Sequence, residues 1–281
     1  LIALGELPIA LFQSLWILLT FRPKLVLGVG GYVTGPFILM AWILRIRTAI
    51  QEQNAMPGIT NRILGKIVDK IFISFEESKK YFPERKVEVT GNPIKEEYYA
   101  NKSKSKDPRF NVLVFGGSKG ARSINFAMVE ALDHLSEDKD SLHFIHQTGQ
   151  EQFESVKTKY DSKKISAEVS PFIFNMANAF RKSNLVICRA GASTIAELAA
   201  CGRAAILVPF PFAANNHQQL NAELLVEQGG AIIVMDSELS GNKLAGLIKE
   251  LMRQPDRLNE MGKASARMAK KDAGKKIVDH C

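Results

Sequence analysis

Short apolar runs rich in β-branched residues alternate along the chain with longer segments in which apolar positions follow a helical period. The apolar runs predict buried β-strands at residues 25–27, 49–50, 71–74, 87–89, 112–115, 143–146, 185–188, 205–208 and 231–234. The helical segments lie at 121–135, 194–200, 218–228 and 244–252. This alternation indicates an α/β fold in which helices cover both faces of parallel sheets.

One combination, a strand followed by a glycine-rich turn and a helix, occurs once in each half of the chain. It occurs at "GVGGYVTGP" (28–36) and again at "GGSKGARS" (116–123). Residues 96–109 between the two halves are charged and rich in Ser and Lys, which is typical of a linker. We therefore expect two Rossmann-like domains that face a cleft, the default place for a ligand. The domains would span 1–95 and 110–262, and residues 263–281 would form a helix that packs back towards the first domain.

Both glycine turns could hold a phosphate, because each exposes backbone N–H groups at the start of a helix. Neither has the spacing of a dinucleotide or nucleotide triphosphate motif. In the first turn Gly28 and Gly30 fit the dinucleotide pattern, but position 33 is Val, although Glu52 stands where a ribose-binding acid is expected. The second turn lacks the terminal Gly-Lys-Ser/Thr of a P-loop. The glycines could equally serve only to make tight turns, and both alternatives stay open.

The stretch "CRAGASTIAELAACG" (188–202) allows two interpretations. Thr194 and Glu197 have the spacing of a capping box, which would make Glu197 structural. Alternatively, the carboxylate of Glu197 could accept both hydroxyls of a ribose. The next predicted strand ends in "VPFPFAANNHQQLNA" (208–222), whose amide side chains suit sugar hydroxyls but are also common in surface loops.

Composition narrows the range of partners without selecting one. The 281 residues carry a formal net charge of +8, which favours anionic partners but also fits a solvated lysine-rich surface. The Lys runs lie in the expected linker and final helix and are not interleaved with aromatics, so we expect no nucleic-acid partner. The three Cys are an odd number and have no metal-ligand spacing, so we expect a reducing compartment. The five His form no metal-ligand motif either, so we expect no metal site. Residues 137–140, "EDKD", are interpreted as solvated surface.

The first twenty residues are apolar, but Glu6, Pro8, Gln13 and Ser14 interrupt them. They lack the basic start of a signal peptide and the uninterrupted run of about 18 apolar residues that a membrane span needs. We expect a helix that is buried in the first domain or that seeks a membrane interface.

Eight motifs in this order give the chain a close resemblance to the MurG family of bacterial peptidoglycan glycosyltransferases, within glycosyltransferase family 28. They are "GVGGYVTGP", "EQNAMPG", "VTGNPIK", "GGSKGARSIN", "HQTG", "PFIFNMANAF", "CRAGASTIAELAACG" and "VPFPFAANNHQQLNA". Each motif is weak alone, but the set covers essentially the whole chain and is specific.

The resemblance implies an inverting transferase of the GT-B fold with no cofactor and no metal. It would move N-acetylglucosamine from UDP-N-acetylglucosamine to undecaprenyl-pyrophosphoryl-muramoyl-pentapeptide, converting lipid I to lipid II. It would work as a peripheral protein on the cytoplasmic face of the plasma membrane, where the apolar first segment with Arg22 and Lys24 could dock. A related UDP-sugar transferase that acts on another lipid acceptor is the alternative.

Site residues follow from the same motifs. Ser118 and Lys95 would lie near the diphosphate or sugar, Phe172 and Ile173 would frame the uracil, and backbone groups of Ile173 would contact its edge. The implied donor-binding set is Lys95, Ser118, Phe172, Ile173, Arg189, Ser193, Thr194, Glu197, Gln218 and Gln219, with Glu197 on the ribose and the two glutamines on the sugar. The implied acceptor-side set is Gly30, Gly31, Tyr32 and Asn54.

The sequence departs from the family pattern at three places, two on the acceptor side and one at a cation of the donor site. The family begins with a strand and "GGTGGH", whose His is a candidate catalytic base, and this sequence has no such stretch. Position 51 is Gln where the family usually has His, and position 95 is Lys where Arg is common. We therefore expect an incomplete N-terminal domain, an unassigned catalytic base, and weak donor binding with poor transfer by this chain.

Overall fold

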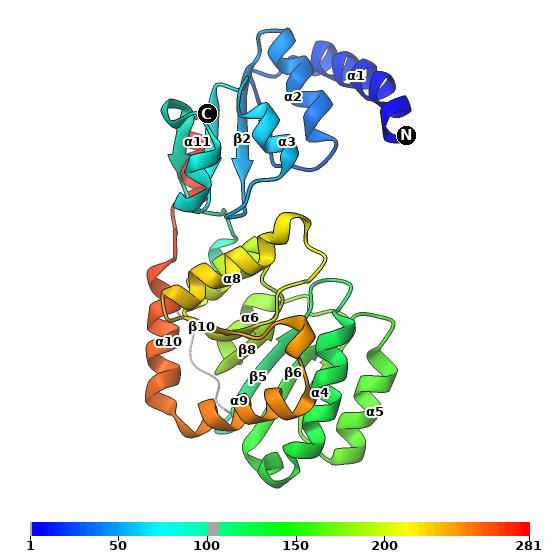
Figure 1. Cartoon of the computed structure of the whole chain (residues 1–281), viewed down its shortest axis with the longest axis vertical. Coiled ribbons are helices and arrows are strands. Elements are labelled where there is room, and N and C mark those ends of the chain that lie inside the picture. The colour runs from blue at the N-terminus through cyan, green and yellow to red at the C-terminus, as the bar shows by residue number, and fades with distance from the viewer. Residues whose placement is uncertain (1, 101–106) are drawn as a thin grey trace. The chain divides into compact units, whose positions relative to one another are not determined.

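The computed structural model of the protein describes residues 2–100 and 107–281, and these fall into two compact units. The first unit comprises the chain up to Pro93 together with Asp272–Cys281, and the second comprises Ile94–Lys271. Each unit contains a parallel sheet covered by helices (Figure 1). The expected α/β class with two Rossmann-like domains is therefore confirmed.

The first unit has a four-stranded sheet in the order β1–β2–β3–β4. Its strands are β1 (Leu25–Gly28), β2 (Arg47–Glu52), β3 (Lys70–Ile73) and β4 (Val87–Val89). Helices α1 (Ile2–Phe21), α2 (Thr34–Ile43) and α3 (Ile59–Leu64) contribute Leu18, Ile38 and Leu64 to one core cluster with the strands. On the other face, α11 (Ala273–Asp279) packs Ile277 against Ala49 and Phe72 (Figure 1).

The second unit has a six-stranded sheet in the order β10–β9–β8–β5–β6–β7. Its strands are β5 (Phe110–Phe115), β6 (Leu142–Gln147), β7 (Ala167–Ser170), β8 (Leu185–Cys188), β9 (Ala204–Leu207) and β10 (Ala231–Ile233). All neighbouring strands are parallel, and the central ones are buried on both faces, which explains their nearly continuous apolar sequences.

Within the described part of this unit, seven α-helices cover the sheet. They are α4 (Arg122–His134), α5 (Phe153–Lys163), α6 (Met176–Lys182), α7 (Ala192–Cys201), α8 (His217–Glu227), α9 (Gly241–Arg253) and α10 (Pro255–Arg267). Ile124 of α4, Tyr160 of α5 and Ile248 of α9 share the main core cluster. On the opposite face, Phe180 of α6 packs edge-to-face on Phe115 of β5, with ring centroids 5.7 Å apart.

The strand order reverses at β5, because the chain continues to β6 on one side and later returns to β8 on the other. In open parallel sheets, ligands bind outside the carboxyl ends of the strands at such a reversal. The topology of the second unit therefore marks the carboxyl ends of β5 and β8 as the place to look for a site.

Two segments differ from the organisation expected from the sequence. Residues 94–100 belong to the second unit, where Glu96–Tyr99 form a 3₁₀ helix and the buried Tyr98 packs on Phe180 at 5.9 Å. The expected linker is thus packed at its start, because Tyr98 is buried there; its residues 101–106 lie outside the described residues. Residues 263–281 do not form one helix, because α10 ends at Arg267 in the second unit and α11 lies in the first.

Removing the side chain of Ile277 should destabilise the first unit and leave the second unchanged. Ile277 is 4% exposed, whereas its neighbour Val278 is 73% exposed. We expect Ile277→Ala to cost about 2–4 kcal/mol and Val278→Ala less than about 0.5 kcal/mol. Amide hydrogen exchange of β2 and β3 measures the destabilisation caused by each substitution, and exchange of β5 and β6 serves as the internal reference. Equal effects of the two substitutions would contradict the packing of α11.

Candidate functional site

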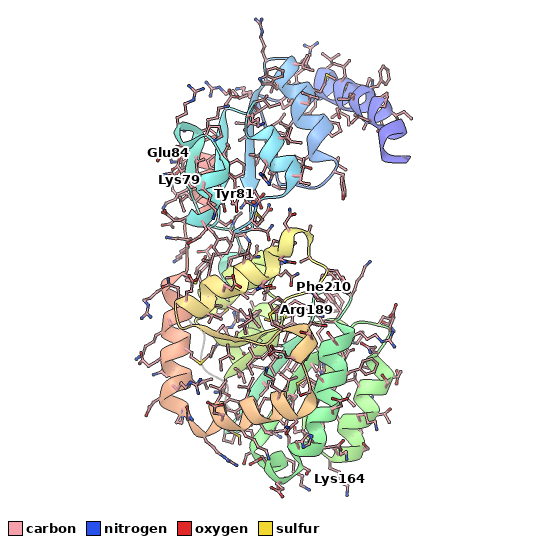
Figure 2. The ribbon with its side chains drawn as sticks, in the orientation of Figure 1. Lys79, Tyr81, Glu84, Lys164, Arg189 and Phe210 are labelled. Atoms are coloured by element: carbon pink, nitrogen blue, oxygen red, sulfur yellow. The ribbon has the colours of Figure 1, made fainter. Side chains whose placement is uncertain are left out.

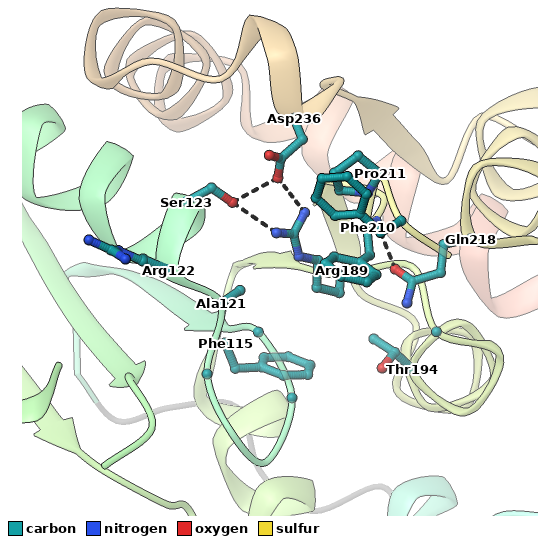
Figure 3. A pocket seen from close by; sticks show the side chains of 15 residues that line it. Phe115, Ala121, Arg122, Ser123, Arg189, Thr194, Phe210, Pro211, Gln218 and Asp236 are labelled. Carbon is teal, nitrogen blue, oxygen red and sulfur yellow. Dashed lines mark hydrogen bonds and ion pairs between the residues drawn. The ribbon is translucent and has the colours of Figure 1, made fainter. Parts of the chain in front are cut away.

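A pocket of about 540 Å³ lies at the reversal of strand order in the second unit (Figure 3). The turn after β5, the start of α7 and the segment 210–212 after β9 form most of its wall. Four of its polar or charged lining side chains are those of Ser123, Arg189, Gln218 and Asp236. The pocket thus occupies the position that the topology indicates for a ligand.

The glycine turn between β5 and α4 needs its glycines for two different reasons. Gly117 and Gly120 have φ angles of +98° and +79°, which favour glycine. A Cβ on Gly120 would lie 2.0 Å from the carbonyl oxygen of Thr148, so this glycine permits close contact with the loop after β6. A Cβ on Gly117 would meet nothing within 4 Å, so the backbone there is open. The turn is therefore packed on one side and open on the other.

Two helices present uncapped N-termini to this pocket. Helix α4 begins after Ala121 and α7 begins after Gly191, and neither N-cap residue makes a side-chain capping hydrogen bond. Both N-cap residues line the pocket. The free N–H groups and the helix dipoles at both ends favour an anion. The capping box expected between Thr194 and Glu197 does not form, because α7 begins at Ala192 and Thr194 is already its third residue.

The guanidinium of Arg189 joins four segments around the pocket (Figure 3). It donates hydrogen bonds to the carbonyl oxygens of Val208 and Pro209, both at 3.1 Å. It also donates to Asp236 Oδ1 at 2.6 Å and to Ser123 Oγ at 2.8 Å, and the Ser123 hydroxyl donates to the same Asp236 oxygen at 2.7 Å. Arg189 is therefore committed to holding the pocket wall, with its charge balanced by Asp236.

The ring of Phe210 completes this arrangement. It lies under the Arg189 guanidinium, with 5.4 Å between Cζ and the ring centroid, and both residues are labelled in Figure 2. The backbone N–H of Phe210 donates to Gln218 Oε1 at 3.0 Å, which ties the start of α8 to the same wall. Gln218 also lines the pocket. Gln219 lies outside the pocket lining and donates to Glu223 Oε1 at 2.9 Å.

Glu197 is half-buried one turn into α7, beside Tyr98 and Lys95. Burial raises its pKa to about 7, although a hydrogen bond from Tyr98 and the positive charge of Lys95 both act to lower it. Burial likewise raises the pKa of the Tyr98 hydroxyl, so this group remains a donor at neutral pH. Lys95 is largely exposed and lies 3.8 Å from Glu97. Glu197 therefore changes its charge state near neutral pH.

The remaining residues of the implied donor set lie outside the lining of this pocket. Ser118 is exposed in the glycine turn, and Ser193 is exposed in the first turn of α7. Phe172 is half-exposed and packs edge-to-face on Phe174, with ring centroids 5.1 Å apart. The backbone N–H of Ile173 donates to Gln147 Oε1 at 2.7 Å, so it is already engaged.

In the first unit, two loops at the carboxyl ends of β1 and β2 carry the implied acceptor-side residues. Gly30 and Gly31 follow β1 with φ angles of +93° and +84°, and a Cβ on Gly31 would meet nothing within 4 Å. Tyr32 beside them is 95% exposed. Gln53 Nε2 donates to the carbonyl oxygen of Val29 at 2.8 Å, which ties the two loops together.

Glu52 organises the second of these loops. It is buried, and its Oε1 accepts hydrogen bonds from the backbone and side chain of Asn54 at 2.9 and 3.2 Å. Its Oε2 accepts from the backbone of Gly58 at 3.3 Å and from Asn61 Nδ2 at 2.8 Å. Glu52 therefore has a structural role in shaping the loop, and Asn54 is held by it.

Comparison with known proteins assigns the chain. The glycosyltransferase family 28 N-terminal domain matches residues 3–73, and the glycosyltransferase family 28 C-terminal domain matches residues 111–277. The chain belongs to glycosyltransferase family 28. Among the described residues no group of His, Cys, Asp and Glu is arranged to hold a metal ion, and no described helix is long and apolar enough to cross a membrane.

Individual relatives support this assignment to glycosyltransferase family 28. One relative, from Myxococcus xanthus (strain DK1622), is 50% identical to this chain, and the match covers 99% of this chain and 73% of the relative's length. It is named UDP-N-acetylglucosamine–N-acetylmuramyl-(pentapeptide) pyrophosphoryl-undecaprenol N-acetylglucosamine transferase. The same-named protein of Geobacter sulfurreducens is 47% identical, covering 95% and 75%. The crystal structure of Acinetobacter baumannii MurG is 34% identical with a TM-score of 0.82, covering 98% of this chain and 79% of that one. The fold class expected from the resemblance, GT-B, is thereby confirmed.

The sequence motifs did not reveal every residue that shapes the family 28 pocket. Asp236 follows β10 and is 47 positions from Arg189, so nothing local indicated their pairing. An acidic residue in the loop that follows the carboxyl end of a strand was the available signal. Ser123 stood in the glycine-turn motif, but its part in the Arg189 network depends on the start of α4. Gln147 stood in "HQTG" and was not assigned a role.

Proposed function

We propose that this protein transfers N-acetylglucosamine from UDP-N-acetylglucosamine to undecaprenyl-pyrophosphoryl-muramoyl-pentapeptide, forming lipid II from lipid I. The proposal is supported by relatives at 44–50% identity that carry the corresponding enzyme name. The single structural observation that carries it is the pocket at the strand reversal of the second unit, where two uncapped helix N-termini meet. Such a pocket suits the diphosphate of a nucleotide sugar.

The diphosphate would lie between the glycine turn and the start of α7. Negative charge grows on UDP as the bond to the sugar breaks, and fixed N–H groups at helix N-termini stabilise that charge. Ser118 and Thr194 would add hydroxyl donors, and Lys95 a positive charge. Arg189 would act indirectly, because its donors already hold the pocket wall.

The nucleoside and sugar would take the remaining donor-set residues. Glu197 would accept the ribose hydroxyls, and Gln218 with Gln219 would contact the sugar. Phe172 would pack on the uracil, and the carbonyl oxygen of Ile173 would accept its N3–H, because the N–H of Ile173 is bonded to Gln147.

The acceptor would use the first unit. The open glycine backbone at Gly30 and Gly31 offers N–H groups to a pyrophosphate, with Tyr32 and Asn54 alongside. The catalytic base that removes the proton of the acceptor hydroxyl is not assigned to any residue of this chain.

We also propose that the protein docks on the cytoplasmic face of the plasma membrane through α1. Leu18 of α1 is buried against the first unit's core, but Ile9, Phe12, Trp16 and Leu19 are 55–71% exposed. The exposed Arg22 and Lys24 follow the helix. Exposed aromatic side chains beside cations suit the interface of an anionic bilayer. Helix α1 would then serve both roles that its sequence left open, packing in the first unit and docking at the membrane.

Transfer to the lipid-linked muramoyl-pentapeptide under single-turnover conditions, with protein in excess, tests the function. We expect radiolabel from UDP-N-acetylglucosamine to appear in that acceptor and not in diacylglycerol. Glu197→Ala should lower the transfer rate by about tenfold or more through loss of ribose hydrogen bonds, whereas Glu227→Ala, at the exposed end of α8, should not. Preferential labelling of another acceptor would refute the proposed reaction.

Affinity for UDP-N-acetylglucosamine should rise with pH through neutrality. With a pKa near 7, Glu197 is mostly protonated at pH 6 and mostly ionised at pH 8, and only the carboxylate accepts both ribose hydroxyls. We expect about tenfold tighter binding at pH 8 than at pH 6 by calorimetry. The diphosphate diester of the ligand does not titrate in this range. Glu197→Gln should remove the pH dependence, and a flat wild-type profile would contradict the assigned role of Glu197.

Binding to anionic vesicles should depend on α1. The triple substitution Phe12→Ser, Trp16→Ser and Lys24→Gln should weaken partitioning into phosphatidylglycerol vesicles by about tenfold or more, because it removes both inserted side chains and one charge. Val278→Ser, an equally exposed apolar position on α11, serves as the matched control. Co-sedimentation measures both, and equal partitioning of the two variants would exclude docking through α1.

A further inference from the structure

Gln147 is the last residue of β6, and its side chain bridges two loops at the carboxyl edge of the second sheet. Its Nε2 donates to the carbonyl oxygen of Gly117 at 2.8 Å, and its Oε1 accepts from the backbone N–H of Ile173 at 2.7 Å. The residue is 2% exposed. One buried carboxamide thus connects the glycine turn after β5 with the loop after β7.

The rest of this corner is equally constrained. The backbone N–H groups of Thr148 and Gly149 donate to the carbonyl oxygens of Ser170 and Pro171, at 3.0 and 3.1 Å. These bonds fix the loop after β7 only as far as residue 171. Beyond that point the bond from Ile173 to Gln147 continues the attachment, between the exposed Phe172 and Phe174.

On the other side, the glycine turn contacts the same corner. The backbones of Gly120 and Gly149 approach so closely that a Cβ on either would lie about 2 Å from backbone of the other loop. This contact fixes the second half of the turn. Gly117, in its open first half, is held by the Gln147 amide and by the N–H of Gly120 at 3.0 Å.

Only a carboxamide of this length can serve both loops. Gly117 offers an acceptor and Ile173 a donor, so the bridging group must donate at one end and accept at the other. A carboxylate would accept from Ile173 but could not donate to Gly117. An apolar side chain would leave the Ile173 N–H without this acceptor and the Gly117 carbonyl with only the bond from the Gly120 N–H.

We infer that Gln147 is a positioning residue that sets the spacing between the diphosphate-binding turn and the uracil-binding loop. The inference rests on the proposed function, which assigns those two loops to the two ends of UDP. Each end of the ligand touches one loop, and Gln147 touches neither end. By holding the two loops at a fixed spacing, Gln147 would let both ends of UDP bind at the same time without reordering either loop. The two ends then bind as linked fragments, which gives a higher affinity than either fragment alone.

Binding of UDP and of its two fragments tests this. We expect Gln147→Met to lower the affinity for UDP, measured by calorimetry, by about tenfold or more. The reason is that one of the two loops must be reordered when UDP contacts both of them. The affinities for uridine and for inorganic pyrophosphate, each of which uses one loop, should fall by less than about threefold, as measured by ligand-observed NMR. The control is Asn111→Leu, which removes another buried amide, bonded to the carbonyl oxygen of Arg109 at the amino end of β5. It should lower thermal stability without changing UDP affinity.

Gln147→Glu provides a second variant that keeps the acceptor for Ile173. This variant should lower the affinities for UDP and pyrophosphate more than the affinity for uridine. It loses the hydrogen-bond donor to Gly117 and adds a negative charge beside the glycine turn. Unchanged UDP affinity in Gln147→Met, or equal losses in that variant and Asn111→Leu, would overturn the inference. A wild-type protein that does not bind UDP would instead overturn the proposed function itself.

Discussion

The pocket of the second unit depends on the ion pair between Arg189 and Asp236. Arg189 leaves the end of β8, Asp236 follows β10, and Ser123 near the start of α4 bonds to both. The same guanidinium holds the carbonyl oxygens that follow β9. Three parallel strands therefore end, and one helix begins, around a common charge. Because the pair is largely shielded from water, removing the Asp236 carboxylate would leave the Arg189 cation without compensation in the pocket wall.

Much of the fold was predictable because a parallel sheet buried on both faces requires apolar strands. The runs 112–115, 143–146, 185–188 and 205–208 all lie within or directly beside observed strands. Strand β7 was not predicted, since "AEVS" has no apolar run and joins the sheet through its backbone pairing with β6. Propensity also could not show that Tyr98 is buried, because that depends on Phe180, which is distant in sequence.

The candidate site was predictable in its motifs and not in its connections. The two glycine turns and the stretch around Glu197 were recognisable locally. The start of α7 was misplaced because Thr194 and Glu197 fit a capping pattern that the true helix start at Ala192 makes impossible. The pairings Arg189–Asp236, Gln147–Ile173 and Tyr98–Glu197 join residues that only the tertiary fold brings together. Such contacts leave no periodic trace in a single sequence.

The placement of α11 has a consequence for how the chain is made. The first unit's sheet is synthesised early, but Ile277, which covers Ala49 and Phe72, emerges only after all of residues 94–271. At ordinary translation speeds this interval is on the order of ten seconds or more, long enough for the second unit to fold in between. During that time one face of the first sheet remains uncovered. The nascent first unit therefore stays partly assembled until α11 has left the ribosome.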